Sequence, residues 1–252
     1  MKIALVIPTY KPHFIYLERL CHNIAEQTRL PDLVVVRASS CDSTEVLDSL
    51  LAKPWPFSLQ ILRTPERQCQ AENRNEGVTA LPSDIDIVSF IDSDDLMHPQ
   101  RLAVIESTIK QGADVVLHNY MTGGANTVPI WDTTISLRAA WDTILLQKES
   151  AIQSGNQIIT REVLLTQPDH IHTPQGKAIT LFRPIPMDEE LEEQLCGHFG
   201  HVSILRRCLA TTKFDEEALG YEDAKFVGDL ATQGYRIGTL YARLSYYTLH
   251  SL

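Results

Sequence analysis

The residues with the clearest potential for chemistry are three closely spaced aspartates, Asp92, Asp94 and Asp95, which directly follow the apolar run Ile85 to Ile91. Hard divalent cations such as Mg²⁺ and Mn²⁺ prefer oxygen ligands and keep coordination positions for phosphate groups. If this segment were extended, alternation would direct Asp92 and Asp94 to one side and Ser93 to the other. The segment therefore predicts a divalent-cation site, and an acidic turn before a helix at Pro99 is the alternative.

A basic residue precedes this acidic segment. Arg74 lies in Ala71-Glu72-Asn73-Arg74-Asn75-Glu76-Gly77, a stretch with helical character. A planar guanidinium matches the oxygens of a phosphate group in geometry and charge. Arg74 is therefore a candidate for contact with a diphosphate or a sugar hydroxyl, and a surface helix with Arg–Glu pairs is the alternative.

A second acidic pair, Glu222 and Asp223, opens a helical pattern that continues through Phe226, Val227 and Leu230. Carboxylates in a first helical turn are favoured by the helix dipole, so the pair has a purely structural explanation. A carboxylate at the edge of a pocket could instead act as a general base toward an attacking hydroxyl. Both interpretations remain open from the residues alone.

Apolar runs alternate with helically spaced apolar residues through the first half of the chain. Strands are expected at Ile3–Ile7, Leu33–Val36, Leu59–Leu62, Ile85–Ile91 and Asp114–Leu117, and helices over residues 14–24, 46–51, 69–77 and 101–110. Strands that alternate with helices build right-handed βαβ units around a mainly parallel sheet covered on both faces. The fold class is therefore α/β, and the aspartates would lie beyond the carboxyl end of a strand, where ligands bind in open parallel sheets.

The second half is less regular. Residues 119–136 are expected to be a loop because of Gly123, Gly124 and Pro129, and a helix is expected over about 139–146. Residues 166–195, with an acidic run at 188–193, are expected to cross the surface. Order returns with a strand at His201–Leu205, a helix at Tyr221–Gln233 and a strand at Arg236–Leu240. One domain is the simplest organisation.

The composition excludes several classes of protein. The chain has 252 residues and a formal charge of −10, which argues against nucleic-acid binding. Five cysteines without a CxxC pair indicate reduced thiols in a cytoplasmic protein. No run of about 18 apolar residues predicts a transmembrane span, although contact with a membrane surface is compatible with this pattern.

Taken together in order, four segments resemble glycosyltransferase family two, the inverting enzymes of GT-A fold. The segments are Val6-Ile7-Pro8-Thr9-Tyr10, Arg74-Asn75-Glu76-Gly77, Phe90-Ile91-Asp92-Ser93-Asp94-Asp95 and Gly220-Tyr221-Glu222-Asp223. The resemblance implies a single GT-A domain over residues 1–252. Residues 1–118 would form the nucleotide-sugar-binding half, and residues 119–252 the half that carries the acceptor site and the catalytic base.

The resemblance also implies roles for individual residues. Asp223, with Glu222 beside it, would be the catalytic base of a transfer from a nucleotide-diphosphate sugar to a carbohydrate or other hydroxyl acceptor, in glycan or polysaccharide synthesis. Mn²⁺ or Mg²⁺ would be held by Asp94, Asp92 and His250. Donor contacts would come from the residues Pro8, Thr9, Tyr10, Ser39, Arg74, Asp92 and Ser93.

One segment departs from the family pattern. Members usually have two acids after the second strand, one of which often binds the base of the nucleotide, whereas this chain has Arg37 and Ala38. Ser39 or Ser40 would take over that contact. The identity of the nucleotide base therefore stays open.

Three other functions remain as alternatives. A sugar nucleotidyltransferase would need a Gly-rich phosphate loop after the first strand, which Pro8-Thr9-Tyr10-Lys11-Pro12 is not. A non-catalytic nucleotide- or glycan-binding relative agrees with the missing acids. A zinc site at His170-x-His172 or His198-x-x-His201 lacks further ligands at fixed spacing, so a satisfied polar or core role is expected for His198 and His201. Trp131 and Trp141 are candidate platforms for the acceptor sugar.

Overall fold

The computed structural model describes residues 1–42, 45–131, 135, 146–148, 169–172, 178–181, 199–218 and 220–250. Most of the expected helix over 139–146 and of the expected surface crossing over 166–195 lies outside the described residues, as do Trp141 and His198. The strands are β1 (Ile3–Tyr10), β2 (Leu33–Ser39), β3 (Ser58–Arg63), β4 (Ile87–Phe90), β5 (Leu96–Met97), β6 (Val115–Gly124), β7 (Leu146–Lys148), β8 (Asp169–His172), β9 (Ala178–Leu181), β10 (Ser203–Leu205) and β11 (Ile237–Leu249). The helices are η1 (Lys11–Tyr16), α1 (Leu17–Ala25), α2 (Glu45–Leu51), α3 (Gln70–Thr79), α4 (Arg101–Lys110), η2 (Phe199–His201), η3 (Arg206–Ala210) and α7 (Glu222–Thr232).

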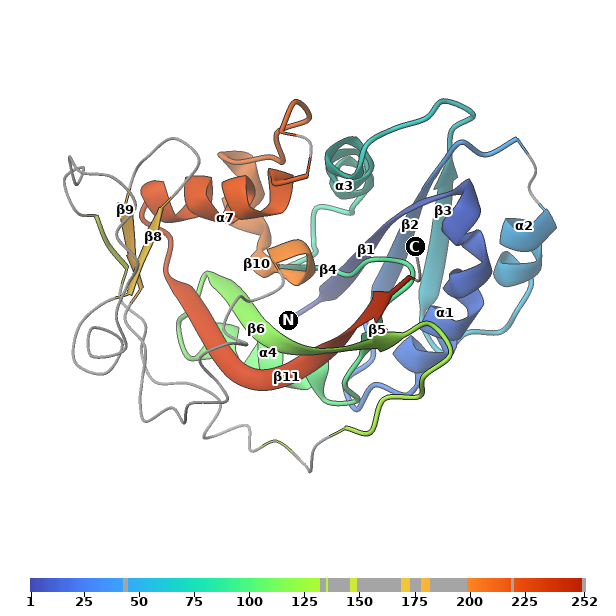
Figure 1. The fold of residues 1–252 in the computed structure, drawn as a ribbon, viewed down its shortest axis with the longest axis horizontal. Helices are drawn as coiled ribbons and strands as arrows, with labels where there is room; N and C mark the ends of the chain where they lie inside the picture. Colours follow the sequence, from blue (N-terminus) through green and yellow to red (C-terminus); the bar gives the residue numbers. More distant parts are fainter. Residues whose placement is uncertain are drawn as a thin grey trace.

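The central sheet contains eight strands in the order β3-β2-β1-β4-β10-β6-β11-β5 (Figure 1). The pairs from β3 to β4 are parallel, β11 is parallel to β6, and β10 and β5 run antiparallel to their neighbours. The fold class predicted from the alternation of strands and helices, a mainly parallel α/β sheet, is confirmed. A smaller sheet joins β7, β9 and β8.

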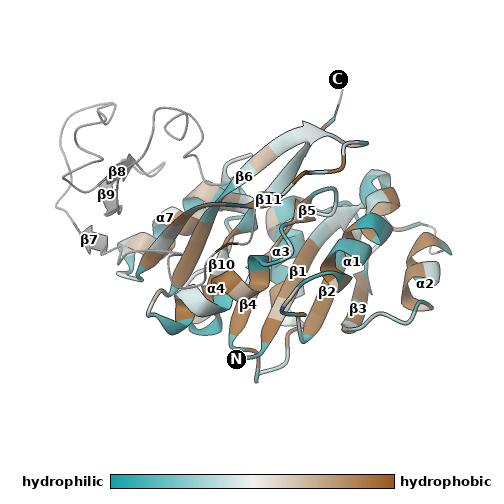
Figure 2. Ribbon diagram, turned by 90° about the horizontal axis from the view of Figure 1, so that it is seen from below, coloured by the Kyte–Doolittle hydropathy of each residue, from teal (hydrophilic) through white to brown (hydrophobic). Residues whose placement is uncertain are grey.

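Helices cover both faces of this sheet because alternate strand residues are apolar on both sides. Ile3, Leu5 and Ile7 of β1 pack with the buried residues of α1, α2 and α4. Ala4 and Val6 of the same strand pack on the opposite face, in the cluster that includes residues of α3 and α7. The central strands accordingly appear as an almost continuous hydrophobic band in Figure 2. This two-sided burial explains the unbroken apolar run at Ile3–Ile7.

Two expectations for the second half are wrong. Residues 119–124 do not form a loop but continue β6, and the last strand does not end at Leu240 but reaches Leu249. Both stretches are polar or Gly-rich, and each is held by the other, because β6 and β11 pair in parallel from Val115 and Ile237 up to Gly124 and Leu249. Cross-strand pairing here outweighs the local loop signals.

Smaller differences concern the ends of elements. The strand expected at Ile85–Ile91 covers only Ile87–Phe90, and the expected strand start at His201 is a turn of 3₁₀ helix. Asp92 to Asp95 do not continue as an extended strand but form a turn, in which the Asp95 N–H donates to the Asp92 carbonyl at 3.2 Å. In this turn Asp92 and Asp94 no longer follow strand alternation.

Among the described residues, no helix is long and apolar enough to cross a membrane.

Candidate active site

The carboxyl ends of β1, β2 and β4 meet at one edge of the sheet, as expected for parallel strands. There the Thr9 hydroxyl donates to the Ser93 Oγ at 2.9 Å, and the Ser39 hydroxyl donates to the Thr9 carbonyl at 3.3 Å. The Asn73 amide of α3 donates to the Ser39 Oγ at 3.1 Å. Thr9, Ser39 and Ser93 are all buried, as is Pro8, whereas Tyr10 is exposed. These hydrogen bonds join the strand ends, and the expected contacts of these residues with a donor stay predictions.

The departure at Arg37 also has a structural explanation. Arg37 is buried and forms an ion pair with Glu76 on α3. Ala38 packs in the core on the face that α1 and α2 cover. The side chains of Arg37 and Ala38 are thus held within the fold at the end of β2, and which nucleotide base the protein binds stays open.

Arg74 brings the two acidic segments together. Its side chain is 1% exposed; one Nη donates to Asp92 Oδ1 at 2.9 Å and the other to Glu222 Oε1 at 2.8 Å. The guanidinium also lies over the ring of Phe214, 5.3 Å from its centroid. Burial acts to lower the pKa of Arg74, but the charges of Asp92, Glu222 and Asp223 outweigh burial and raise it. One permanently charged side chain therefore links the end of β4 to the start of α7.

Asp223 is half-buried in the first turn of α7, directly after Glu222. Its Oδ1 accepts from the Ala224 N–H at 2.7 Å. The carboxylate that the family resemblance implies as the base is thus placed beside the Arg74 network.

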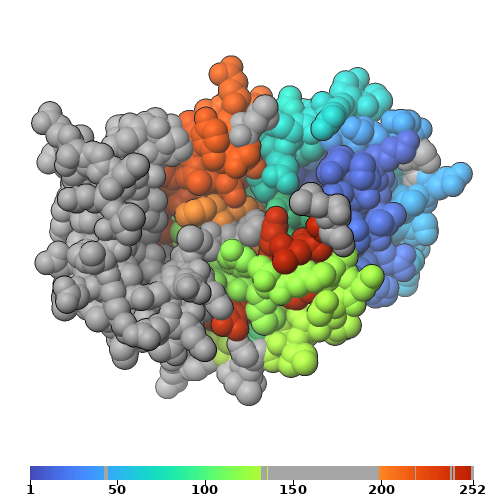
Figure 3. Space-filling model, in the orientation of Figure 1, coloured from blue at the N-terminus to red at the C-terminus, as the bar shows by residue number. Residues whose placement is uncertain are grey.

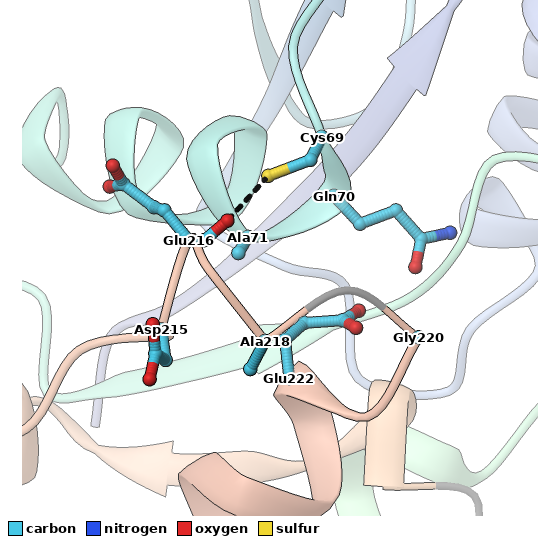
Figure 4. Close-up of a pocket in the computed structure, with 8 residues that line it drawn as sticks. All are labelled: Cys69, Gln70, Ala71, Asp215, Glu216, Ala218, Gly220 and Glu222. Atoms are coloured by element: carbon cyan, nitrogen blue, oxygen red, sulfur yellow. Dashed lines mark hydrogen bonds between the residues drawn. The ribbon is translucent and has the colours of Figure 1, made fainter.

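A cavity of about 210 Å³ adjoins this network. In Figure 4, Cys69, Gln70 and Ala71 approach it from the start of α3, and Glu222 lies on the other side, at the start of α7. The remaining lining residues are Asp215, Glu216, Ala218 and Gly220. Pockets for drug-sized ligands measure roughly 300–1,000 Å³, so this cavity admits only a small group.

Asp94, in the turn after β4, lies beside the carboxyl end of β11. The His250 Nε2 is 2.6 Å from Asp94 Oδ2, and His13 Nδ1 is 3.4 Å from the same oxygen. Burial acts to raise the pKa of Asp94, but hydrogen bonds from His13 and His250 lower it below its ordinary value. The structure thus brings together Asp94 and His250, two of the residues expected to bind a metal. His13, which the sequence reasoning missed, completes the cluster.

The segment that leads to His250 is held by hydrogen bonds to the aspartate turn. The Thr248 N–H donates to Asp95 Oδ1 at 2.7 Å, and its hydroxyl donates to the Asp94 carbonyl at 2.6 Å. Figure 3 shows this end of the chain at the surface, with the green of β6 below it and the blue N-terminal segment beside it. The hydrogen bonds of Thr248 to this turn therefore place His250 beside Asp94.

A second group of side chains lies beneath this turn. His201 is fully buried, with Nε2 2.8 Å from Asp95 Oδ2 and Nδ1 2.8 Å from the Ser245 Oγ. Burial and the charges of Asp92 and Asp94 raise the pKa of Asp95 well above its ordinary value. His201 is thus the satisfied buried histidine that the sequence favours over a zinc ligand. Trp131, one of the two tryptophans considered for the acceptor, packs edge-on against His98.

No curated protein matches the chain. Among solved structures, S. aureus TarS 1–349 in complex with UDP matches 99% of this chain and 61% of its own at 18% identity and a TM-score of 0.60. The complex with UDP-GlcNAc matches 100% of this chain and 60% of its own, at 17% identity and a TM-score of 0.59. The chain thus spans about three fifths of the length of these neighbours, and at this identity the likeness shows the fold alone.

The comparison with family sequence models identifies the family of the chain. The sequence model described as Glycosyl transferase family 2 matches residues 4–174, which is more than half of the chain. This range includes the end of β1, Arg74 and the aspartate turn. The chain therefore belongs to glycosyltransferase family 2.

Proposed function

We propose that this chain is a metal-dependent inverting glycosyltransferase that moves a sugar from a nucleotide-diphosphate sugar to a hydroxyl of a carbohydrate or other acceptor, in the synthesis of a glycan or polysaccharide. The observation that carries the proposal is the contact of one buried guanidinium, Arg74, with both Asp92 and Glu222. Family membership and the fold shared with TarS, which was solved with UDP and with UDP-GlcNAc, support it.

The proposed division of labour follows the two acidic segments. Residues 1–118 would bind the donor, and residues 119–252 would supply the acceptor side and the base. Asp223 would take the proton from the attacking hydroxyl, a contribution commonly worth about 10²–10⁴-fold in rate. Attack on the side of the sugar opposite to the diphosphate would invert its anomeric configuration.

Arg74 would act as a positioning residue in this scheme. In the structure its guanidinium is engaged by Asp92 and Glu222, and this arrangement fixes the base-carrying start of α7 relative to the end of β4. A direct contact of Arg74 with the diphosphate stays a prediction.

The residues around Asp94 fit a divalent cation. A carboxylate oxygen and an imidazole nitrogen, the donor atoms of Asp94 and His250, lie close together and are only partly buried. When bound there, Mn²⁺ or Mg²⁺ would offset the negative charge that develops on the leaving diphosphate, an effect worth several kcal/mol. Asp92 is expected to support this side of the site through its contact with Arg74.

The test is a panel of nucleotide sugars incubated with Mn²⁺, with free nucleoside diphosphate as the readout. Asp223→Asn removes the base and keeps the size of the side chain, so we expect transfer to fall by at least about 10²-fold with donor affinity unchanged. Asp229→Asn, on the same helix and paired with Lys225, is the matched control and should retain activity.

Two outcomes would contradict the proposal. Binding of donors without release of nucleoside diphosphate would identify a non-catalytic relative. Equal losses of transfer and donor binding in Asp223→Asn would remove Asp223 from the role of base.

A further inference from the structure

We propose that His13 is a third protein ligand of the cation, with Asp94 and His250, and that the resulting site prefers Mn²⁺ or Co²⁺ to Mg²⁺. The inference deepens the proposed function, since it concerns the same cation. It rests on the geometry of a short segment after β1 for which neither the family resemblance nor the comparisons assign a role.

The local structure of η1 places His13 on a defined face. In a 3₁₀ helix, side chains three residues apart lie above one another. Tyr10, at the N-terminal boundary of η1, His13 and Tyr16 have this spacing, and their rings follow each other with centroid distances of 4.5 Å and 5.8 Å. His250 joins the same cluster, with its ring centroid 5.4 Å from those of His13 and Tyr16.

Both histidines direct one nitrogen to the same carboxylate oxygen. His13 Nδ1 and His250 Nε2 lie 3.4 Å and 2.6 Å from Asp94 Oδ2, and the three potential ligand atoms are all within 4.8 Å of one another. The side chains of His13, Asp94 and His250 are 25%, 14% and 38% exposed. The site is therefore formed by the protein on one side and remains accessible to a cation and a substrate on the other.

The second nitrogen of each ring lies near a tyrosine. His13 Nε2 is 3.2 Å from the Tyr10 hydroxyl, and His250 Nδ1 is 3.5 Å from the Tyr16 hydroxyl. In metal sites the ring nitrogen that does not bind the metal usually donates its proton to a neighbouring oxygen, which fixes the tautomer and the ring orientation. With a cation bound, the two tyrosine oxygens would accept from His13 Nε2 and His250 Nδ1. His13 Nδ1 and His250 Nε2 would then bind the cation instead of donating to Asp94.

The donor set determines the preferred ion. Two imidazoles and one carboxylate suit first-row transition metals. Mn²⁺ and Co²⁺ belong to that series and accept imidazole beside oxygen ligands, whereas Mg²⁺ is bound almost entirely through oxygen. The other described group of suitable side chains is Asp92, Asp95 and His201, and it is less suited to a cation. Its members are engaged by Arg74, Thr248 and Ser245, and two of the three are fully buried.

The test measures binding of Mn²⁺, Co²⁺ and Mg²⁺ to the full chain by calorimetry, without any sugar nucleotide. We expect His13→Gln to lower Mn²⁺ affinity by about 10–100-fold, and Mg²⁺ to bind wild type at least about 10-fold more weakly than Mn²⁺. His22→Gln is the matched control, because His22 lies exposed on α1 near Glu18 and Trp55, and it should bind Mn²⁺ like wild type.

A spectroscopic arm separates ligation from a change in folding. Pulsed electron paramagnetic resonance of bound Mn²⁺ should detect nitrogen couplings from two imidazoles in wild type and from one in His13→Gln. Wild-type affinity or unchanged nitrogen couplings in His13→Gln would overturn the proposal, and equal affinities for Mg²⁺ and Mn²⁺ would overturn the preference. These titrations contain no donor, so they do not depend on transfer. Asp223→Asn, in which transfer is expected to fail, should still bind Mn²⁺, and this separates failure of the cation site from failure of the proposed function.

Discussion

Arg74 shows how a charge can be buried in this protein. Its side chain is one of the largest that are fully buried in the described part of the chain. Moving an ion out of water costs several kcal/mol, and this cost is offset only when excellent partners surround the charge. Asp92 and Glu222 are such partners, and each is itself nearly buried. Removing the guanidinium would leave both carboxylates without their counter-ion.

We therefore expect Arg74→Met to reduce the free energy of unfolding by about 3–5 kcal/mol, measured by urea denaturation. The matched control is Arg207→Met. The Arg207 side chain is 63% exposed, and its partner Asp114 keeps Arg236 as a second cation. We therefore expect this variant to lose at most about 1 kcal/mol. Similar losses in the two variants would show that Arg74 does not serve as the buried counter-ion of Asp92 and Glu222.

The sequence indicates part of this site because the motifs are local. Asp94 and His250 are suggested by the family resemblance, and they lie in contact. His13 escapes notice because Asp94 and His250 are distant from it in the sequence and come near it only in the folded chain. Arg74 contacts both Asp92 and Glu222, and Glu222 lies 148 positions from Arg74 in the sequence. No pattern in a single sequence encodes such a contact.

At the level of elements, β6 and β11 support each other over segments that resemble loops. Gly123 leaves room for the Tyr246 side chain of β11, since a Cβ at this position would lie 2.0 Å from the Tyr246 hydroxyl oxygen. Tyr246 in turn donates to the Gly124 carbonyl at 3.1 Å. The apolar runs of β1 and β2 are readable from sequence because each is buried on two faces. The ends of β6 and β11 are not, because their order depends on the partner strand.

Gly123→Ala should consequently lower the free energy of unfolding by about 1–3 kcal/mol, the usual cost of forcing extra atoms into a packed contact. Because Tyr246 lies on the strand that leads to His250, we also expect Mn²⁺ affinity to fall. Gly124→Ala is the control: its Cβ would meet only Thr127 Oγ1 at 3.7 Å, and its effect should stay within about 0.5 kcal/mol. Indistinguishable urea curves for the two variants would contradict this account of the strand pair.

For the molecule as a whole, the order of strands interlocks the two halves of the chain. β10 lies between β4 and β6, so a strand from the second half fills a gap within the sheet of the first. The cluster that contains Val88 and Phe90 is completed by Phe226 and Leu230 of α7. Donor and acceptor halves can thus be distinguished by proposed role but share one sheet and one core.

A fragment of residues 1–118 should therefore fail to fold cooperatively. It would expose the edge of β4 and the apolar face that α7 covers, and we expect no sigmoidal transition in circular dichroism during urea denaturation. The full chain, measured in parallel, should show one. A sharp transition for the fragment would mean that β10 and α7 are dispensable for the core of the first half.

The fastening of β11 to the aspartate turn also has a practical consequence for the design of expression vectors. Thr248 and His250 contact the turn itself, so a peptide that directly follows His250 would start next to Asp94. An oligohistidine purification tag in that place would bring extra imidazoles to the cation and distort titrations with Mn²⁺. Met1, at the opposite end of β1 (Figure 1), is the better point of attachment.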